Sequence, residues 1–283
     1  MVKKEMKGRK NIIELIGKGF ELWWKNPAII LPFLFYTLII VVAGLILFLL
    51  MGLVIFGSSF GGQAIGTSSG FSALQGLAVG ESNDTTMEKL VENLSVSPGM
   101  LALVIVFVIV FVLVLMFARA FFSSGAIAMA KEVTQGKKTS LATMNRSGKK
   151  FFWRYFLVEL IIGLGVVIWL LIFSLPAILT KNITLAIIPL ISLILLFFLY
   201  LLFYLAEYVL VLNDLNPFEA LKESFNIVKK NYWATLGLFV LFSLMSLVIS
   251  FIPLSSFLNF FIQLLVLTPA MTIAFTLFTL ERQ

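Results

Sequence analysis

Long apolar runs alternate with short polar segments along this chain. Six of the runs are candidates for membrane-spanning helices, at residues 28–56, 99–130, 155–179, 183–212, 233–252 and 255–280. A spanning helix needs about 20 apolar residues, because a helix rises about 1.5 Å per residue and the hydrocarbon core is about 30 Å thick. Each run reaches that length, so the pattern predicts an all-α membrane protein with six transmembrane helices.

The polar segment at 216–233 has the strongest pattern of its own. Asn216, Pro217 and Glu219 are a helix-start signal, because they supply an N-cap, a first-turn proline and the second half of a capping box. Apolar residues then recur at helical spacing on one face, namely Phe218, Leu221, Phe225 and Val228. Charged residues take the other face, which predicts an amphipathic helix lying on the membrane surface before the next span.

Looser versions of this segment occur at 11–27 and 139–155. In the first of them the predicted apolar face consists of Ile12, Ile13, Ile16, Phe20 and Trp23. Aromatic and cationic side chains, which anchor helices at the lipid boundary, stand near the ends of all three segments: Trp23, Trp24, Lys25, Trp153, Arg154, Lys229, Lys230, Tyr232 and Trp233. The pattern favours three repeated units, each an interfacial helix followed by a span, an outer turn and a second span. The alternative is that basic segments with aromatic edges are ordinary on the inner side of membrane proteins.

The distribution of charge predicts the orientation. All but three of the 21 Lys and Arg residues fall in segments that this topology places in the cytoplasm, the exceptions being Lys89, Arg119 and Lys181. The segment at 57–99 has one basic residue against four acidic ones. The positive-inside rule then places both termini in the cytoplasm of a cell-membrane protein. We predict a basic tail at 1–10, a single transmembrane domain at 11–280, and an extracytoplasmic loop inserted at 57–99.

Composition agrees with a membrane protein and narrows the chemistry. The chain is 60% hydrophobic and 12% charged with a mean hydropathy of +1.07, whereas soluble domains carry roughly a quarter charged residues. The net charge of +7 follows the predicted topology, so we expect no nucleic-acid partner. The sequence contains no Cys and no His, which removes thiol nucleophiles, histidine bases and Cys/His metal sites. We therefore expect no catalytic residue, no metal and no cofactor.

Three ionisable residues lie inside predicted spans: Arg119, Glu159 and Glu207. Charges in hydrocarbon are unfavourable, so such residues usually pair or face a polar cavity. One hypothesis is a polar cluster in which Arg119 binds an anionic headgroup or substrate and a glutamate is a proton or cation site. The other is a structural Arg–Glu pair, or glutamates that extend to the interface.

Two motifs carry a resemblance to a known family. They are Asn216-Pro217-x-Glu219-Ala220-Leu221-x-x-Ser224-Phe225-x-x-Val228-x-x-Asn231-Tyr232-Trp233 and Glu14-Leu15-x-x-x-Gly19-Phe20-Glu21-Leu22-x-x-x-Asn26-Pro27. They resemble a widespread uncharacterised six-helix family, related to the membrane domain joined to some glycerophosphodiester phosphodiesterases and with stand-alone archaeal and bacterial members. The resemblance covers most of the chain outside 57–99. It implies the six-helix fold and topology, and the family has no agreed activity. The phosphodiesterase catalytic domain is absent here, so the resemblance implies no catalytic residue.

Two functions remain open from the sequence. One is a permease or exporter for an amphiphile or small solute, which predicts a water-accessible cavity at Arg119 and Glu207. The other is a structural protein whose basic interfacial helices organise anionic lipid headgroups on the cytoplasmic face or recruit a protein partner, which predicts a solidly packed bundle. An intramembrane enzyme is disfavoured, because its acid–base groups would be two isolated glutamates.

Overall fold

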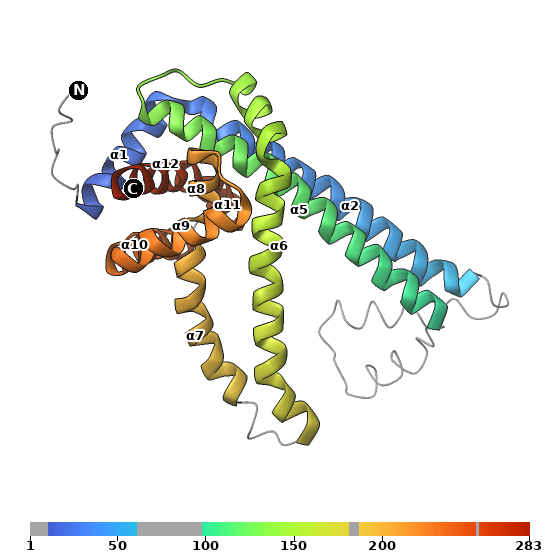
Figure 1. Cartoon of the computed structure of the whole chain (residues 1–283). Coiled ribbons are helices and arrows are strands. Elements are labelled where there is room, and N and C mark those ends of the chain that lie inside the picture. The colour runs from blue at the N-terminus through green and yellow to red at the C-terminus, as the bar shows by residue number, and fades with distance from the viewer. Residues whose placement is uncertain (1–10, 61–97, 181–186, 253–254) are drawn as a thin grey trace. The chain divides into compact units, whose positions relative to one another are not determined.

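A computed structural model describes residues 11–60, 98–180, 187–252 and 255–283 of the chain. Every regular element in these ranges is a helix (Figure 1). The predicted tail at 1–10, most of the predicted loop at 57–99 and the turn around Lys181 lie outside the described residues. The chain divides into two compact units, Leu38–Leu115 and the remainder. Arg119, Glu159 and Glu207 belong to the unit formed by Met1–Thr37 and Met116–Gln283.

The helices follow one another in this order: α1 (Ile12–Lys25), the 3-10 turn η1 (Pro27–Ile30), α2 (Leu31–Phe60), α5 (Pro98–Thr134), α6 (Leu141–Thr180), α7 (Ile187–Phe203), α8 (Ala206–Asn213), α9 (Pro217–Lys230), α10 (Tyr232–Phe251), α11 (Ser256–Ile262), the π turn η3 (Gln263–Leu267) and α12 (Thr268–Arg282). Within the described residues, six segments are long and apolar enough to cross a membrane: Pro27–Leu50, Ile105–Thr134, Leu141–Pro176, Ile187–Asn213, Tyr232–Phe251 and Ser256–Arg282. This is the arrangement of a multi-pass membrane protein.

Large apolar side chains lie on the outside of the long helices. Ile191 and Ile194 are exposed on α7, and Phe48 on α2 and Val106 on α5 are exposed in the same way. In water, each square ångström of such surface would be unfavourable by about 25 cal/mol. Hydrocarbon removes that penalty, so the outer surface of these helices is suited to lipid.

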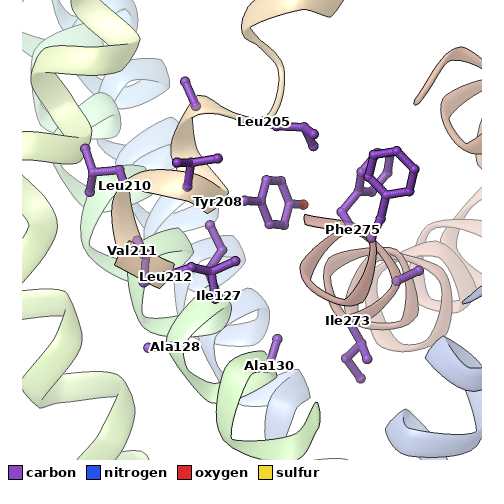
Figure 2. Close-up of a cluster of buried hydrophobic side chains, with 14 of the residues drawn as sticks. Ile127, Ala128, Ala130, Leu205, Tyr208, Leu210, Val211, Leu212, Ile273 and Phe275 are labelled. Carbon is purple, nitrogen blue, oxygen red and sulfur yellow. The ribbon is translucent and has the colours of Figure 1, made fainter. Parts of the chain in front are cut away.

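The protein core lies where α5, α8 and α12 meet. Figure 2 shows Ile127 of α5, Leu210 of α8 and Ile273 of α12 among the buried side chains. Most of α8 is buried, and α12 is buried almost continuously from Pro269 to Thr279. These two short helices are therefore surrounded by protein, in contrast to the outward-facing α7.

Small residues let two helix pairs approach closely. A Cβ atom at Gly19 of α1 would lie 2.7 Å from the carbonyl oxygen of Ala270 on α12. A Cβ atom at Gly125 of α5 would lie 2.7 Å from Cγ of Met144 on α6. Glycine is needed at both positions because any side chain there would overlap the facing helix.

The residues of α9 that are buried in protein coincide with the predicted apolar face only at Val228. The buried residues of α9 are Ala220, Ser224, Ile227 and Val228. Phe218, which belongs to the apolar face predicted to lie on the membrane surface, is 74% exposed. Helix α1 shows the same division, because Leu15 and Gly19 are buried while Ile13 is exposed. The buried faces include small residues, such as Gly19 and Ala220, which allow close helix contact.

The predicted interfacial helix at 139–155 is not a separate element. Figure 1 draws α6 as one uninterrupted helix, and it runs from Leu141 to Thr180. By contrast, α1 ends where Asn26 precedes Pro27 and adopts a non-helical conformation, as a residue before proline tends to do. Helix α9 ends at Asn231, which also has a non-helical conformation, although no proline follows it. Residues 149–155 contain no asparagine and no proline, so α6 continues through this segment.

Candidate functional site

Arg119 and Glu159 form an ion pair between α5 and α6. Arg119 Nε lies 2.8 Å from Glu159 Oε1, and the side chains are 50% and 8% exposed, respectively. Among the described residues, neither carboxylate oxygen of Glu159 accepts a hydrogen bond of acceptable geometry. The pair is therefore held by charge and proximity, and Glu159 keeps unused acceptor capacity in a buried place.

The second carboxylate, Glu207 of α8, is joined to the same face of α6. The hydroxyl of Tyr155 donates a hydrogen bond to Glu207 Oε2. Tyr155 lies one helical turn before Glu159, and it is buried. Residues four apart share a helix face, so α6 presents Tyr155 to one glutamate and carries the other glutamate beside it.

Electrostatic interactions extend the cluster to further tyrosines. The charge of Arg119 interacts with those of Glu207 and Glu159, and also with Tyr155 and Tyr200. The structure therefore brings together the three ionisable residues that the sequence placed inside spans. The sequence analysis missed the tyrosines, although Tyr200, Tyr204 and Tyr208 recur every four residues around Glu207.

A break in the fourth span lies directly at this cluster. The run predicted as one helix at 183–212 is divided, because α7 ends at Phe203 and α8 begins at Ala206. Ser224 of α9 is buried and donates to the carbonyl of Leu202 at 2.9 Å, just before the break. A side chain from another helix thus satisfies a carbonyl at the interruption, which explains how a break persists without proline or glycine.

The sixth span is also interrupted. Thr268 and Pro269 lie in the first turn of α12, and the π turn η3 immediately precedes them. The Thr268 hydroxyl donates to the carbonyl of Gln263 at 2.9 Å. Because Pro269 has no N–H to donate, the helix widens at this point before it resumes as α12.

A second polar group, which the sequence analysis did not find, fixes α6 to the end of α8. Asp214 follows α8 in the left-handed conformation, and it accepts hydrogen bonds from Lys150 Nζ at 2.5 Å and Arg154 Nη1 at 2.9 Å. The hydrogen bond from Lys150, with the charges of both cations, holds the pKa of Asp214 below its ordinary value of 3.8. Its stabilising contribution is therefore complete above that value and is lost as the pH falls through the lowered pKa.

The predicted interfacial anchors occupy different environments. Trp24, Trp153 and Trp233 are exposed, whereas Trp23 and Tyr232 pack partly against the core. The cations are placed as follows: Lys25 pairs with Glu21 at 2.5 Å, Lys229 lies over the ring of Phe225, Lys230 is exposed, and Arg154 binds Asp214. Arg154 thus contacts protein where the sequence predicted a lipid anchor. The three exposed tryptophans are not packed into the core, and their place at the lipid boundary stays a prediction.

Within the described ranges, no group of three or more His, Cys, Asp or Glu residues is arranged to hold a metal ion.

Comparison with known families shows to which family the chain belongs. Residues 11–281 match the family described as Domain of unknown function (DUF7847). The chain belongs to the DUF7847 family. The match runs through the predicted loop at 57–99, and the family description names neither an activity nor glycerophosphodiester phosphodiesterases. No curated protein and no solved structure matches the chain.

Proposed function

We propose that this protein carries a small solute or an amphiphile across the cell membrane, without catalysis. The observation that carries the proposal is the group formed by Arg119, Glu159 and Glu207, which lies within three candidate spans. A structural ion pair needs one arginine and one glutamate. A second carboxylate in an apolar setting is unfavourable unless it pairs or faces a water-filled cavity, and Glu207 shares the cation of Arg119 with Glu159.

The broken fourth helix supports the same proposal. Transporter binding sites commonly form where a membrane helix is discontinuous, because the interruption places polar groups at the level of the bilayer. Here Glu207 lies in the first turn of α8, directly after such an interruption. Half of the Arg119 side-chain surface is exposed, so this charge is not sealed inside the bundle.

A structural role is the second candidate, and the outer faces of α1 and α9 favour it. Trp24, Phe218 and Trp233 are exposed beside cationic residues, as in helices that lie at a lipid interface. In this proposal the helices bind anionic headgroups on the cytoplasmic face or recruit a protein partner. The cytoplasmic termini, the threefold repeat and the relation to the phosphodiesterase-linked membrane domain remain our proposals, based on charge pattern and motif spacing.

The absence of native cysteine allows a direct test of water access. Single cysteines are introduced as Tyr200→Cys at the cluster and Ile194→Cys on the outer side of α7, where Ile194 is 63% exposed. A charged, membrane-impermeant methanethiosulfonate is then applied to the protein in lipid nanodiscs. We expect Tyr200→Cys to react faster by on the order of tenfold or more, because only a hydrated thiolate reacts readily.

Equal and slow modification at both positions would show that water does not reach the cluster. The transport proposal would then be rejected and the structural role retained. The two variants are matched because both lie on α7 and neither removes a charge from the cluster.

A further inference from the structure

The first turns of α6 carry an exposed cationic face. Six Lys and Arg residues and no acidic residue lie within residues 133–158. Arg146 and Lys149 are exposed, and they are neighbours on the helix surface because they lie three residues apart. Met144 and Gly148 are buried on the opposite side of the helix. One side of this part of α6 therefore packs on protein, and the other side presents positive charge.

The protein itself neutralises little of this charge. Asp214 is shared by Lys150 and Arg154, so one carboxylate faces two cations. Arg146 and Lys149 form no ion pair with any residue that the structure describes. The surface is therefore complementary to an anionic partner.

The connection before α6 adds two more cations at a defined place. Helix α5 ends in a turn at Gly136, which has a φ of 75°. The backbone N–H of Gly136 donates to the carbonyl of Val133, and that of Lys137 donates to the carbonyl of Glu132 at 3.0 Å, as in a Schellman helix end. Lys137 and Lys138 follow and are exposed.

The length of α6 determines which partner this surface meets. The helix has 40 residues without interruption (Figure 1), so it is about 60 Å long, whereas the hydrocarbon core of a bilayer is about 30 Å thick. A large part of α6 must therefore project beyond the hydrocarbon. The projecting part is the cationic one, because charges in hydrocarbon are unfavourable.

Trp153 relates the cations to the depth of the lipid. Its ring is stacked on Phe117 and Phe156 at centroid distances of 5.9 and 5.7 Å, and 53% of the residue is exposed. Taking Trp153 as the boundary that the sequence predicts, Lys149 lies four residues outside it, or about 6 Å along the axis. The headgroup layer is about 5–8 Å thick on each side, so Lys149 lies at the level of the lipid phosphates.

The charge balance distinguishes α6 from the other two amphipathic segments. Helix α1 has two lysines against two glutamates, and α9 has three lysines against two glutamates. A group of four or more Lys and Arg residues directly beside a membrane span is typical of sites for anionic lipid. Within the three segments, that description fits α6.

We propose that Arg146 and Lys149, with Lys137 and Lys138 beside them, bind the headgroup phosphates of anionic phospholipids in the surrounding bilayer. The guanidinium of Arg146 supplies paired donors that match a phosphate, and the lysines supply point charges. The inference does not depend on transport. It assigns headgroup binding to α6, whereas the structural role above assigned it to α1 and α9.

The test compares two lipids that differ only in headgroup charge. The purified full chain in detergent is equilibrated with phosphatidylglycerol and phosphatidylcholine of the same acyl chains, and native mass spectrometry counts the molecules of each that stay bound. We expect phosphatidylglycerol to be preferred by on the order of tenfold or more, and the preference to fall as salt screens the exposed cations. Equal retention of the two lipids would overturn the inference.

Substitutions locate the site. Lys149→Gln should weaken phosphatidylglycerol binding about fivefold, and Arg146→Gln/Lys149→Gln by on the order of tenfold or more, because each cation near the surface contributes separately. Lys222→Gln removes one exposed cation from α9 and is the matched control, with an expected change below about twofold. A loss in the control as large as that in Lys149→Gln would show diffuse attraction in place of a site. Should the α6 variants fail to fold, Lys137→Gln/Lys138→Gln tests the same surface and should weaken binding in the same way.

Glycerol phosphate separates a membrane lipid from a soluble anion. It carries a phosphate without acyl chains, so it should not displace phosphatidylglycerol at equal concentration. Displacement would assign the surface to a soluble phosphate compound and overturn the lipid assignment. The cysteine assay at Tyr200 reports on a different part of the protein, so failure of the transport proposal and failure of this inference are measured separately.

Discussion

Replacing Arg119 with leucine is expected to destabilise the folded protein by about 3 kcal/mol. Removing one partner of a buried ion pair typically costs about 3–5 kcal/mol, because the remaining charge has no counter-ion. We take the lower end of that range because Arg119 keeps half of its side-chain surface exposed. The measurement is the free energy of unfolding in mixed detergent micelles, compared between wild type and Arg119→Leu.

The double variant Arg119→Leu/Glu159→Leu is the control for this prediction. It removes the ion pair but leaves Glu207, which also interacts with Arg119, without that cation, so part of the lost stability should return. A change below about 1 kcal/mol in the single variant would indicate an ion pair as weak as those on protein surfaces. The cluster would then lack the energetic role assigned to it here.

Adding one methyl group at Gly19 is expected to destabilise the protein by about 2 kcal/mol, since overpacking typically costs about 1–3 kcal/mol. The new Cβ would lie 2.7 Å from the Ala270 carbonyl oxygen. That atom belongs to the backbone of α12, so it cannot rotate away. Gly19→Ala should therefore lower the unfolding temperature of the protein in detergent.

Gly17→Ala, half a turn away on α1, is the matched control. A Cβ there meets no atom within 4 Å, so the substitution should stabilise the helix by up to about 1 kcal/mol through helix propensity alone. Opposite signs for the two substitutions are the expected result. Equal effects of the same sign would mean that α1 does not pack on α12 at Gly19.

The six candidate spans could be predicted from the sequence because length and apolar composition decide whether a helix can cross hydrocarbon. The faces of α1 and α9 that pack against protein could not be predicted in this way. Lipid is as apolar as a protein core, so hydrophobicity does not separate the inside of a membrane protein from its outside. The apolar pattern of α9 places Phe218 on the face toward the membrane surface, and it does not reveal that Ala220 and Ser224 are buried in protein.

The site was predictable only in part, for a related reason. Arg119, Glu159 and Glu207 are conspicuous because a charge inside an apolar run is rare. The helix break beside Glu207 depends on Ser224, which lies 22 residues from its partner Leu202, so no local signal marks it. Asp214 likewise acquires its role from Lys150 and Arg154 of another helix. Contacts between distant segments determine both features.

The sidedness of two introduced cysteines tests the membrane topology most directly. Ser69→Cys lies in the acidic segment outside the described residues, and Ser140→Cys lies at the exposed, basic connection before α6. In intact cells a membrane-impermeant maleimide should label Ser69→Cys, and it should label Ser140→Cys only after the membrane is permeabilised. Labelling of both cysteines from the same side would contradict the six-span arrangement on which the site and its function depend.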